Sequence, residues 1–173
     1  TQNLHYINVP YSAVEDFALI GQVSDGPPLV LIVNIDTPYK SVAEIIADAK
    51  ANPTKLSFGS SGPATSPAIA ITQFNALAKT SIADVSYRGT GAAAQAVLTG
   101  EVQGSFTFMS TARQFADDKK VRALAIANAK RSEAWPDLPT MGELGYPNFD
   151  HSGFVGLAAP GKTPAAIVAV LNK

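Results

Sequence analysis

The sequence contains no cysteine and carries few charges. The absence of cysteine excludes disulfide bonds, thiolate metal ligands and a cysteine nucleophile. Charged residues make up only 16% of the chain and the formal net charge is −1, so there is no excess of positive charge to attract nucleic acid or an anionic membrane. We therefore expect no nucleic-acid partner.

Long apolar runs are also missing. The longest, PPLVLIVNI at 27–35, is far shorter than the roughly 20 residues that a membrane-spanning helix requires, so we predict a buried strand and no membrane insertion. No signal-peptide pattern is present, and the chain ends at Lys173 within a predicted helix. We expect an excised fragment or a processed chain.

Strand and helix patterns alternate along the 173 residues, which are enough for one well-buried domain. Runs rich in branched apolar residues predict strands, and apolar residues at helical spacing predict helices. The alternation predicts an α/β fold with a mostly parallel sheet flanked by helices. The expected strands are 29–35, 56–58, 82–87, 103–108, 121–127 and 154–159, and the expected helices are 67–79, 91–99, 111–117 and 164–172, with a helical turn at 140–144.

One further helix has clear signals at both ends. Ser41 followed three residues later by Glu44 forms a capping box, in which each residue satisfies a backbone N–H of the other. The Asn52-Pro53 pair ends the apolar periodicity. We predict a helix between these points.

The segment SFGSSGPATS at 57–66 joins a predicted strand to a predicted helix. It brings hydroxyl groups next to a helix N-terminus, where unpaired backbone N–H groups and a partial positive charge favour an anion. Gly62 lets the backbone approach a ligand closely. Two interpretations remain open, an anion cradle or an ordinary loop whose hydroxyls cap the helix. The candidates are Ser60, Ser61, Gly62, Pro63, Ala64, Thr65 and Ser66.

Two other strand-to-helix turns carry similar chemistry. SYRGTGAA contains Tyr87, Arg88, Gly89 and Thr90, and a third turn begins at Thr107-Phe108. Ligands of open α/β sheets bind outside the carboxyl ends of the strands, where such turns lie. The Arg88 side chain is better suited to the surface than to the ligand, and Phe108 to the core.

Known catalytic patterns do not fit these turns. No Gly-Lys-Ser/Thr follows Gly62, and Pro63 is incompatible with a nucleophile elbow, so neither a P-loop nor an esterase turn is predicted. No His/Asp/Glu cluster has metal-ligand spacing. A hydrolase using Ser60 or Ser61 with His151 as the base is a remote alternative, because His5 lies in the N-terminal piece.

Five segments in order carry a family resemblance: VPYSAVEDFALIGQV, KSVAEIIADAKANPTKLSFGSSG, SYRGTGAAAQAVLTGEV, VRALAIANAKRSEAWPDLPTMGELGYP and GLAAPGKTPAAIVAVLN. The fourth, with Arg-Ser, Pro-Asp-Leu-Pro-Thr and Glu-x-Gly-Tyr, is the most specific. Over nearly its whole length the chain resembles the tripartite tricarboxylate transporter solute-binding proteins, also called Bug or TctC-like proteins.

The resemblance implies a periplasmic binding protein of type II, with two domains that close on a ligand. Residues 1–28 would be a partial domain 1 and the entry to the hinge, 29–150 the ligand-binding domain 2, and 151–173 the return hinge with another part of domain 1. Exposed apolar surface would follow from the partial domain, and with it self-association.

The resemblance also implies how ligand is held. The loop matching Ser60–Ser66 would bind a carboxylate through backbone N–H groups and hydroxyls, flanked by Tyr87–Thr90. Thr107 stands where the family often has an acidic residue, so an ammonium group is less well served than a plain carboxylate. The implied ligand-binding residues are Ser60, Ser61, Gly62, Pro63, Ala64, Thr65, Ser66, Tyr87, Arg88, Gly89, Thr90, Thr107 and Phe108.

By this resemblance the protein is expected to capture a small carboxylate, such as a di- or tricarboxylate or an aromatic acid, in the periplasm of a Gram-negative bacterium. It would deliver the solute to the membrane subunits of a tripartite transporter, without catalysis, cofactor or metal. The alternative is a ligand-sensing module that feeds a two-component signalling system.

Overall fold

The computed structural model describes residues 10–151 and 153–173. The chain divides into two compact units, one made of Pro28–Ser152 and the other of Thr1–Pro27 with Gly153–Lys173. Each unit is described by itself. The assignment of residues 29–150 to a ligand-binding domain stays a prediction.

The larger unit is built on a five-stranded sheet in the order β4-β3-β5-β2-β6. Its strands are β2 (Leu29–Asn34), β3 (Ser57–Ser60), β4 (Ala83–Ser86), β5 (Gly104–Phe108) and β6 (Val121–Ile126). Strand β3 pairs in parallel with β4 and β5, whereas β2 lies antiparallel between β5 and β6. All strands except β2 therefore run in one direction, which confirms the α/β fold with a mostly parallel sheet.

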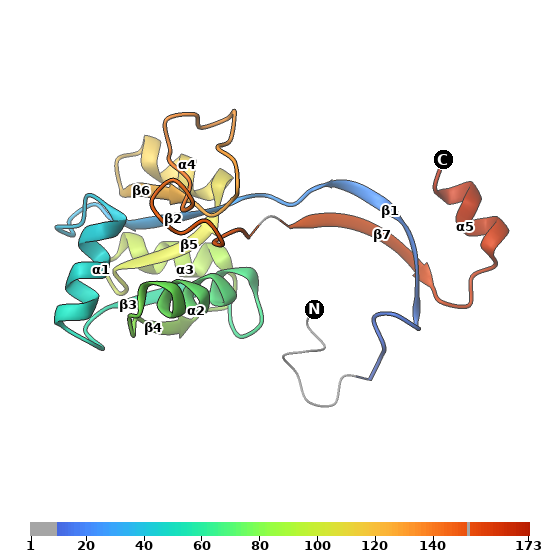
Figure 1. The fold of residues 1–173 in the computed structure, drawn as a ribbon, viewed down its shortest axis with the longest axis horizontal. Helices are drawn as coiled ribbons and strands as arrows, with labels where there is room; N and C mark the ends of the chain where they lie inside the picture. The colour runs from blue at the N-terminus through green and yellow to red at the C-terminus, as the bar shows by residue number, and fades with distance from the viewer. Residues whose placement is uncertain (1–9, 152) are drawn as a thin grey trace. The chain divides into compact units, whose positions relative to one another are not determined.

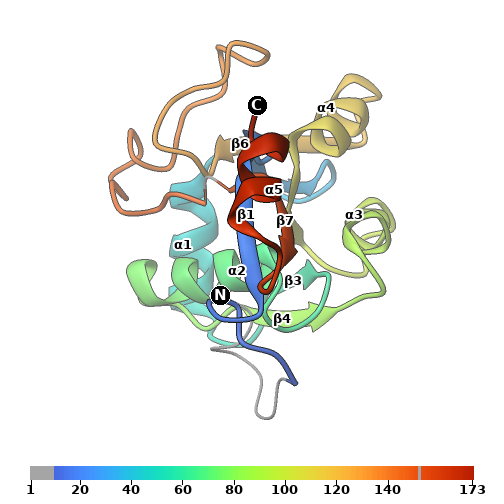
Figure 2. The ribbon, with the colours of Figure 1, turned by 90° about the vertical axis from the view of Figure 1, so that its right-hand side faces the viewer.

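Helices cover both faces of this sheet (Figure 2). They are α1 (Val42–Ala51), α2 (Ser66–Ala78), α3 (Thr90–Leu98) and α4 (Met109–Asp117). All six residues of β2 are buried, and they alternate between the two faces as a strand requires. Leu29, Leu31 and Val33 pack with α1 and α2, whereas Val30 and Ile32 pack with α3 and α4. The central strand thus joins two apolar layers.

Helix α1 begins where the capping box predicts, but the carboxylate of Glu44 accepts from the N–H of Lys40 and not from that of Ser41. The Ser41 hydroxyl accepts a hydrogen bond from the Glu44 N–H at 3.3 Å, and the Glu44 carboxylate accepts one from the Lys40 N–H at 2.5 Å. At the same edge of the sheet, the buried Asn34 amide donates to the Val97 carbonyl at 2.7 Å and so holds the end of α3. The polar groups of Ser41, Glu44 and Asn34 at this end of β2 are therefore paired within the protein.

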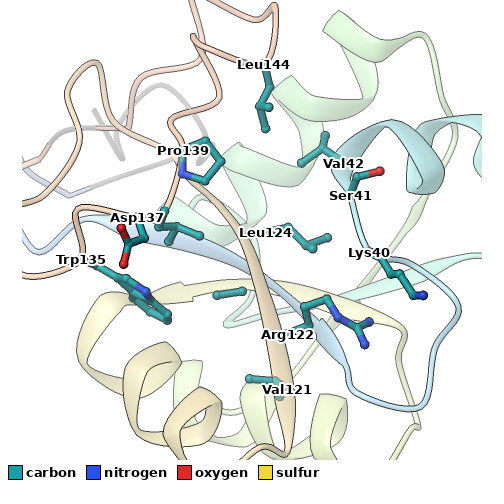
Figure 3. A pocket seen from close by; sticks show the side chains of 12 residues that line it. Lys40, Ser41, Val42, Val121, Arg122, Leu124, Trp135, Asp137, Pro139 and Leu144 are labelled. Carbon is teal, nitrogen blue, oxygen red and sulfur yellow. The ribbon is translucent and has the colours of Figure 1, made fainter.

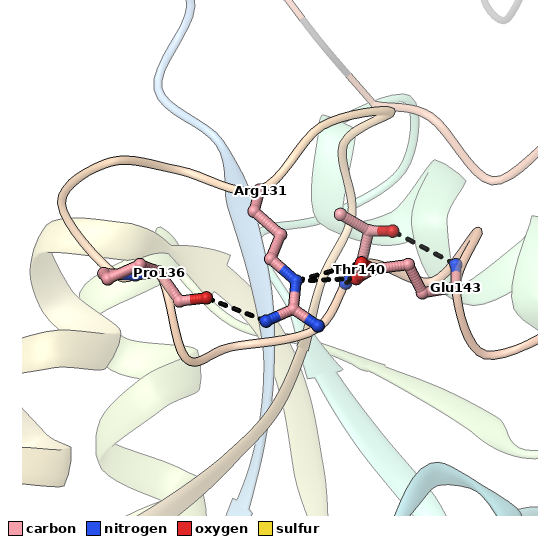
Figure 4. Close-up of polar contacts among 4 residues, drawn as sticks. All are labelled: Arg131, Pro136, Thr140 and Glu143. Carbon is pink, nitrogen blue, oxygen red and sulfur yellow. Dashed lines mark hydrogen bonds and ion pairs between the residues drawn. The ribbon is translucent and has the colours of Figure 1, made fainter.

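A clamp organises the segment after β6 (Figure 4). The Arg131 guanidinium donates to both carboxylate oxygens of Glu143 and to the Pro136 carbonyl. The Glu143 carboxylate also accepts a hydrogen bond from the Thr140 N–H at 2.7 Å. In return, the Glu143 N–H donates to the Thr140 hydroxyl at 3.1 Å. The Leu144 N–H donates to the Thr140 carbonyl, as the predicted helical turn requires. The motif residues of this segment therefore serve its folding.

The smaller unit contains an antiparallel ribbon of β1 (Phe17–Asp25) and β7 (Phe154–Pro160), followed by α5 (Ala165–Leu171) (Figure 1). The side chains of Leu19 and Phe154 are 77% and 71% exposed. Exposed apolar surface is present on this unit as expected, and self-association through it stays a prediction. In the part of the chain that the structure describes, no helix has both the length and the apolar character to cross a bilayer.

Candidate functional site

The predicted site residues gather at one edge of the sheet. Strands β3, β4, β5 and β6 run in the same direction and end at Ser60, Ser86, Phe108 and Ile126. Helices α2, α3 and α4 follow the first three of these strands and so begin at this edge. Helix α1 follows the oppositely directed β2 and begins at the other edge. The carboxyl edge of the sheet therefore collects three helix N-termini.

The connections that follow β3 and β5 lie on opposite faces of the sheet. Strand β3 leads into α2, which packs on one face of the sheet, and β5 leads into α4, which packs on the other. These two strands are neighbours in the sheet. A point where adjacent strands send their connections to opposite faces is where open α/β sheets form a ligand crevice. In this sheet that point lies between the turn at Ser60–Ser66 and the end of β5.

The turn after β3 is held by its own polar groups. The buried Ser60 hydroxyl accepts a hydrogen bond from the Gly62 N–H at 3.2 Å, and the Thr65 hydroxyl donates to the Gly62 carbonyl at 2.7 Å. Gly62 adopts a φ of 103°, a conformation that glycine reaches without strain. Thr65 occupies the N-cap position of α2 without capping it through its side chain. The hydroxyl therefore shapes the turn and leaves the helix N–H groups to other acceptors.

Capping differs sharply between the two edges of the sheet. At the N-terminus of α1 the Ser41 side chain serves as a cap. In α2, α3 and α4 no N–H of the first turn donates a hydrogen bond to the side chain of the N-cap residue. Their first backbone N–H groups have no intrahelical acceptor and carry partial positive charge. The Met109 N–H at the start of α4 donates to the Pro28 carbonyl at 2.9 Å. The donors suited to an anion, without a cationic side chain, are therefore those at the starts of α2 and α3.

The turn after β4 lies directly beside the first turn. The backbone N–H of Tyr87 donates to the Ser60 carbonyl at 2.9 Å, and the N–H of Gly89 donates to the Tyr87 carbonyl at 2.9 Å. Gly89, with a φ of 107°, is the N-cap of α3, whose first helical bond runs from Ala93 to Gly89. The N–H groups of Thr90 and its next two neighbours therefore lack intrahelical acceptors.

The side chains of this second turn point to other partners. The Tyr87 hydroxyl donates to a Glu101 carboxylate oxygen at 2.8 Å. Burial, together with the bond to Glu101 and its charge, raises the pKa of Tyr87 to about 12. Arg88 is exposed, as predicted for a surface arginine. The contribution of this turn to the candidate site is consequently its backbone.

The end of β5 contributes a buried hydroxyl. Thr107 is fully buried, and its hydroxyl oxygen has no hydrogen-bond partner among the described residues. Phe108 is the N-cap of α4 and packs against the apolar cluster beneath α1 and α2. Thr107 pairs with Val30, which pairs in turn with Ile126, so this row of residues crosses three strands.

Two residues of this edge escaped the sequence analysis as ligand candidates, Asn128 and His151. Each has a buried polar side-chain atom, Oδ1 of Asn128 and Nε2 of His151, without a hydrogen-bond partner among the described residues. The His151 N–H donates to the Ala127 carbonyl at 2.7 Å, which places the backbone of His151 just beyond the end of β6. No local motif marks this approach of two segments, because 23 positions of sequence separate Asn128 from His151.

The geometry gives no support to a serine hydrolase. Within the described residues no hydrogen bond joins His151 Nε2 to a serine hydroxyl. Burial lowers the pKa of His151, and the nearby charge of Asp150 opposes this effect. His5, the other histidine, lies outside the described residues. In the described part of the chain no group of His, Asp and Glu side chains is placed to hold a metal ion.

A separate groove of about 530 Å³ runs along the amino-terminal half of β6 (Figure 3). Trp135 and Asp137 lie on one side of it, Lys40 and Arg122 on the other. The Arg122 guanidinium is occupied by the Tyr39 carbonyl at 2.6 Å. None of the predicted site residues lines this groove, and the guanidinium of Arg122 is already paired with a backbone carbonyl.

The fold and this edge define a periplasmic-binding-protein type of architecture, and the comparisons identify the family. Residues 1–173 match the family described as the tripartite tricarboxylate transporter family receptor, and the chain belongs to this family. A curated relative, the UPF0065 protein in the tcbD-tcbE intergenic region of Pseudomonas sp. strain P51, is 33% identical over 168 residues, covering 96% of this chain and 50% of the relative. The chain spans about half the length of the curated relatives it matches.

Solved structures agree with the family. The Rhodopseudomonas palustris protein Rpa4515 with adipate superimposes with a TM-score of 0.87 at 26% identity, over 97% of this chain and 56% of that one. MatC from the same organism, with bound malate, superimposes with a TM-score of 0.80 at 29% identity, over 90% of this chain and 53% of that one. The periplasmic binding protein BugD superimposes with a TM-score of 0.79 at 30% identity, over 90% of this chain and 52% of that one. The predicted family and fold are thereby confirmed, and the family is one of solute-binding proteins.

Proposed function

We propose that this chain forms the carboxylate-holding half of a solute-binding protein, and that the carboxyl edge of its five-stranded sheet is the binding site. The main support is that helix N-termini at the two edges of the sheet differ in whether a side chain caps them. Helix α1 has a capping side chain, whereas α2, α3 and α4 begin without one at the edge where β3 and β5 send their connections apart. Donors left without intrahelical acceptors favour an anionic ligand.

In this proposal the backbone does most of the binding. The N–H groups at the start of α2 and α3 donate to the ligand carboxylate, and the hydroxyls of Ser61, Thr65, Ser66 and Thr90 add polar contacts. The two turns are shaped by Gly62, Pro63, Ala64 and Gly89. The end of β5, with Thr107 and Phe108, borders the proposed site. Tyr87 and Arg88 contribute through their backbone, since the Tyr87 hydroxyl bonds Glu101 and Arg88 is exposed.

The proposed activity is binding without chemistry. Closure of two domains around the solute would be favoured by the ligand, because a ligand shifts the population toward the conformation that it binds more tightly. The partner we propose is the membrane part of a tripartite tricarboxylate transporter, on the basis of the family description. The periplasm is the proposed compartment, supported by the periplasmic relative BugD.

A thermal-shift screen tests this function on the protein in its full natural length. The acids would include adipate and malate, which two relatives hold, together with citrate, aromatic acids and amino acids. A ligand that binds the native state raises the melting temperature by mass action. We expect a shift of several degrees with at least one carboxylate. The same acid as its uncharged amide should give none.

A double variant locates the site. Ser61→Ala with Thr65→Ala removes two hydroxyls of the first turn, and we expect the shift to fall to less than about half, because the backbone donors remain. The matched control is Thr72→Ala, which removes a hydroxyl within α2 that donates to the Ala68 carbonyl. No shift with any acid, or an equal loss of the shift in the control, would overturn the proposal.

A further inference from the structure

The groove along β6 lies at an edge of the sheet that is only partly covered. Strand β6 is the last in the order β4-β3-β5-β2-β6, so it pairs with β2 on one side. On its other side, the Ile126 N–H donates to the Pro139 carbonyl at 2.8 Å, and the Met141 N–H donates to the Ile126 carbonyl at 2.9 Å. Within the described residues no segment bonds that side of 121–125. The amino-terminal part of the edge is therefore open.

The register of β2 with β6 shows which backbone groups face the open side. The Ile35 N–H donates to the Lys120 carbonyl at 3.3 Å, so these opposite residues form a hydrogen-bonded pair. Along an antiparallel ladder such pairs alternate with pairs that exchange no hydrogen bond. By this register Val121 and Ala123 belong to pairs that exchange none. Their N–H and carbonyl groups therefore point away from β2, and both residues line the groove.

The walls of the groove belong to the two apolar layers of the larger unit. Val42 and Leu124 are part of the layer with α1 and α2. Val121 and Leu138 are part of the layer with α3 and α4, and Trp135 packs against that layer. Successive side chains of a strand point to opposite faces of its sheet. A further strand beside β6 would thus bury apolar side chains against both layers.

The wall that carries Trp135 is held in place by structural contacts. The Arg113 guanidinium carbon lies 5.0 Å from the centre of the Trp135 ring, and Arg113 also donates to the Ala134 carbonyl at 3.3 Å. Arg131 of the clamp donates to the Pro136 carbonyl at 2.9 Å. The Trp-Pro-Asp-Leu-Pro segment, which the proposed carboxylate site does not use, therefore forms one side of the groove before any partner arrives.

Unpaired charges of opposite sign lie on the two sides of the groove (Figure 3). Lys40 lies on one side with Arg122, and Asp137 lies on the other. Lys40 and Asp137 are exposed, and within the described residues neither side chain takes part in an ion pair or a hydrogen bond. An occupant with an acidic group toward Lys40 and a basic group toward Asp137 would pair both. Such pairs at a rim fix orientation more than they add affinity.

A second copy of this chain does not supply this arrangement of charges. Two copies joined through antiparallel β6 strands are related by a two-fold axis perpendicular to the sheet, which keeps each face of the sheet on its own side. The wall with Lys40 and Arg122 would then meet its own copy, and like charges would repel. The groove accordingly favours a different protein as its occupant.

We propose that this groove is a docking site for an extended segment of another protein, which adds to the sheet as a strand beside β6. The segment carries apolar side chains on both faces, an acidic residue toward Lys40 and a basic residue toward Asp137. Main-chain hydrogen bonds to Val121 and Ala123 supply affinity, and the walls supply selectivity. None of the carboxylate-site residues lines the groove, so this inference does not depend on the proposed function.

Selection from a displayed library of random peptides of about ten residues tests the site on the protein in its full natural length. We expect enriched peptides with micromolar affinity, measured by fluorescence polarisation. A selected peptide is then N-methylated on one or the other set of alternate amides. One set should weaken binding at least about tenfold and the other less than about threefold, because only alternate N–H groups of a strand face a given neighbour.

Variants of the protein place the peptide in the groove. Ala123→Pro removes an N–H that β2 does not use, and we expect binding to weaken at least about tenfold. Lys40→Glu should weaken binding about threefold or more, and lysine in place of the acidic residue of the peptide should restore it. The matched control is Lys50→Glu, at an exposed lysine of α1 outside the groove, which should change the affinity less than about twofold. Thermal melting establishes that each variant is folded, and Lys40→Glu serves if Ala123→Pro is not.

Three results would overturn the proposal. The first is that no peptide is enriched over selection without the protein. The second is that the enriched peptides bind Lys40→Glu and Ala123→Pro as they bind the native chain, or respond equally to both sets of N-methyl groups. The third is a dimer in analytical ultracentrifugation that Ala123→Pro dissociates, because this would assign the groove to a second copy of the chain.

Discussion

The carbonyl oxygen of Ser60 accepts a hydrogen bond from the backbone N–H of Tyr87 at 2.9 Å. This bond joins the turn that leads into α2 to the turn that leads into α3. Two helix N-termini on opposite faces of the sheet are thereby fixed relative to each other. Donors that are fixed before binding lose little entropy when the ligand arrives, which favours affinity.

A carboxylate built into the protein should compete with the ligand at this place. Gly91 lies in the first turn of α3, and a Cβ added there meets no other atom within 4 Å. We expect Gly91→Asp to weaken carboxylate binding about tenfold or more by like-charge repulsion, while the melting temperature without ligand rises or stays level because the charge suits the helix dipole. The neutral Gly91→Asn is the control for size. Equal binding by the two variants would show that the ligand anion does not lie at α3.

Two neighbouring glycines should respond to alanine in opposite ways. Gly89 has a φ of 107°, so Gly89→Ala is expected to lower the free energy of unfolding by about 1–2 kcal/mol through backbone strain alone. Gly91 is not among the residues of positive φ, and Gly91→Ala should raise the free energy of unfolding by up to about 1 kcal/mol. Urea unfolding followed by circular dichroism measures both. Equal effects would contradict the described turn.

The Tyr87 hydroxyl should matter to stability and not to the ligand. It donates to Glu101 at 2.8 Å, so Tyr87→Phe is expected to change carboxylate affinity by less than about twofold. Loss of this hydrogen bond should lower the free energy of unfolding by about 1 kcal/mol. Calorimetric titration and urea unfolding on the same variant separate the two effects. A large loss of affinity with unchanged stability would place the hydroxyl on the ligand instead.

The clamp of Arg131 and Glu143 should make stability depend on pH. The hydrogen bond from the Thr140 N–H, followed by Arg131, lowers the pKa of Glu143 below its ordinary value of 4.5. Because the folded-state pKa is the lower one, the contribution of the carboxylate is present above the unfolded pKa and is lost as pH falls through the folded pKa. The stability difference between the native chain and Glu143→Gln should thus shrink from pH 6 to pH 3.

Urea midpoints across this pH range measure the difference. The control is Glu133→Gln, at an exposed glutamate of the same segment, which should change the midpoint little at any pH. A constant difference between the native chain and Glu143→Gln at all pH values would mean that the carboxylate charge adds nothing to the clamp.

Much of the fold was accessible from local pattern. The alternation of strands and helices, the capping box of Ser41 with Glu44 and the burial of 29–34 follow from periodicities and end signals that extend over only a few residues. The hydroxyls and the two glycines of 57–66 are likewise visible as residue types at a strand-to-helix turn. These features need no partner from elsewhere in the chain.

The direction of β2 and the completion of the site were decided by tertiary structure. A buried strand has the same composition whether its neighbours run with it or against it, so its antiparallel place between β5 and β6 is set by long-range pairing. The same holds for the Thr65 hydroxyl, which binds the Gly62 carbonyl instead of capping α2. The sequence by itself determined which residues can hold an anion. Only the tertiary structure brought His151 to the end of β6, because its backbone hydrogen bond to Ala127 joins segments that no local pattern connects.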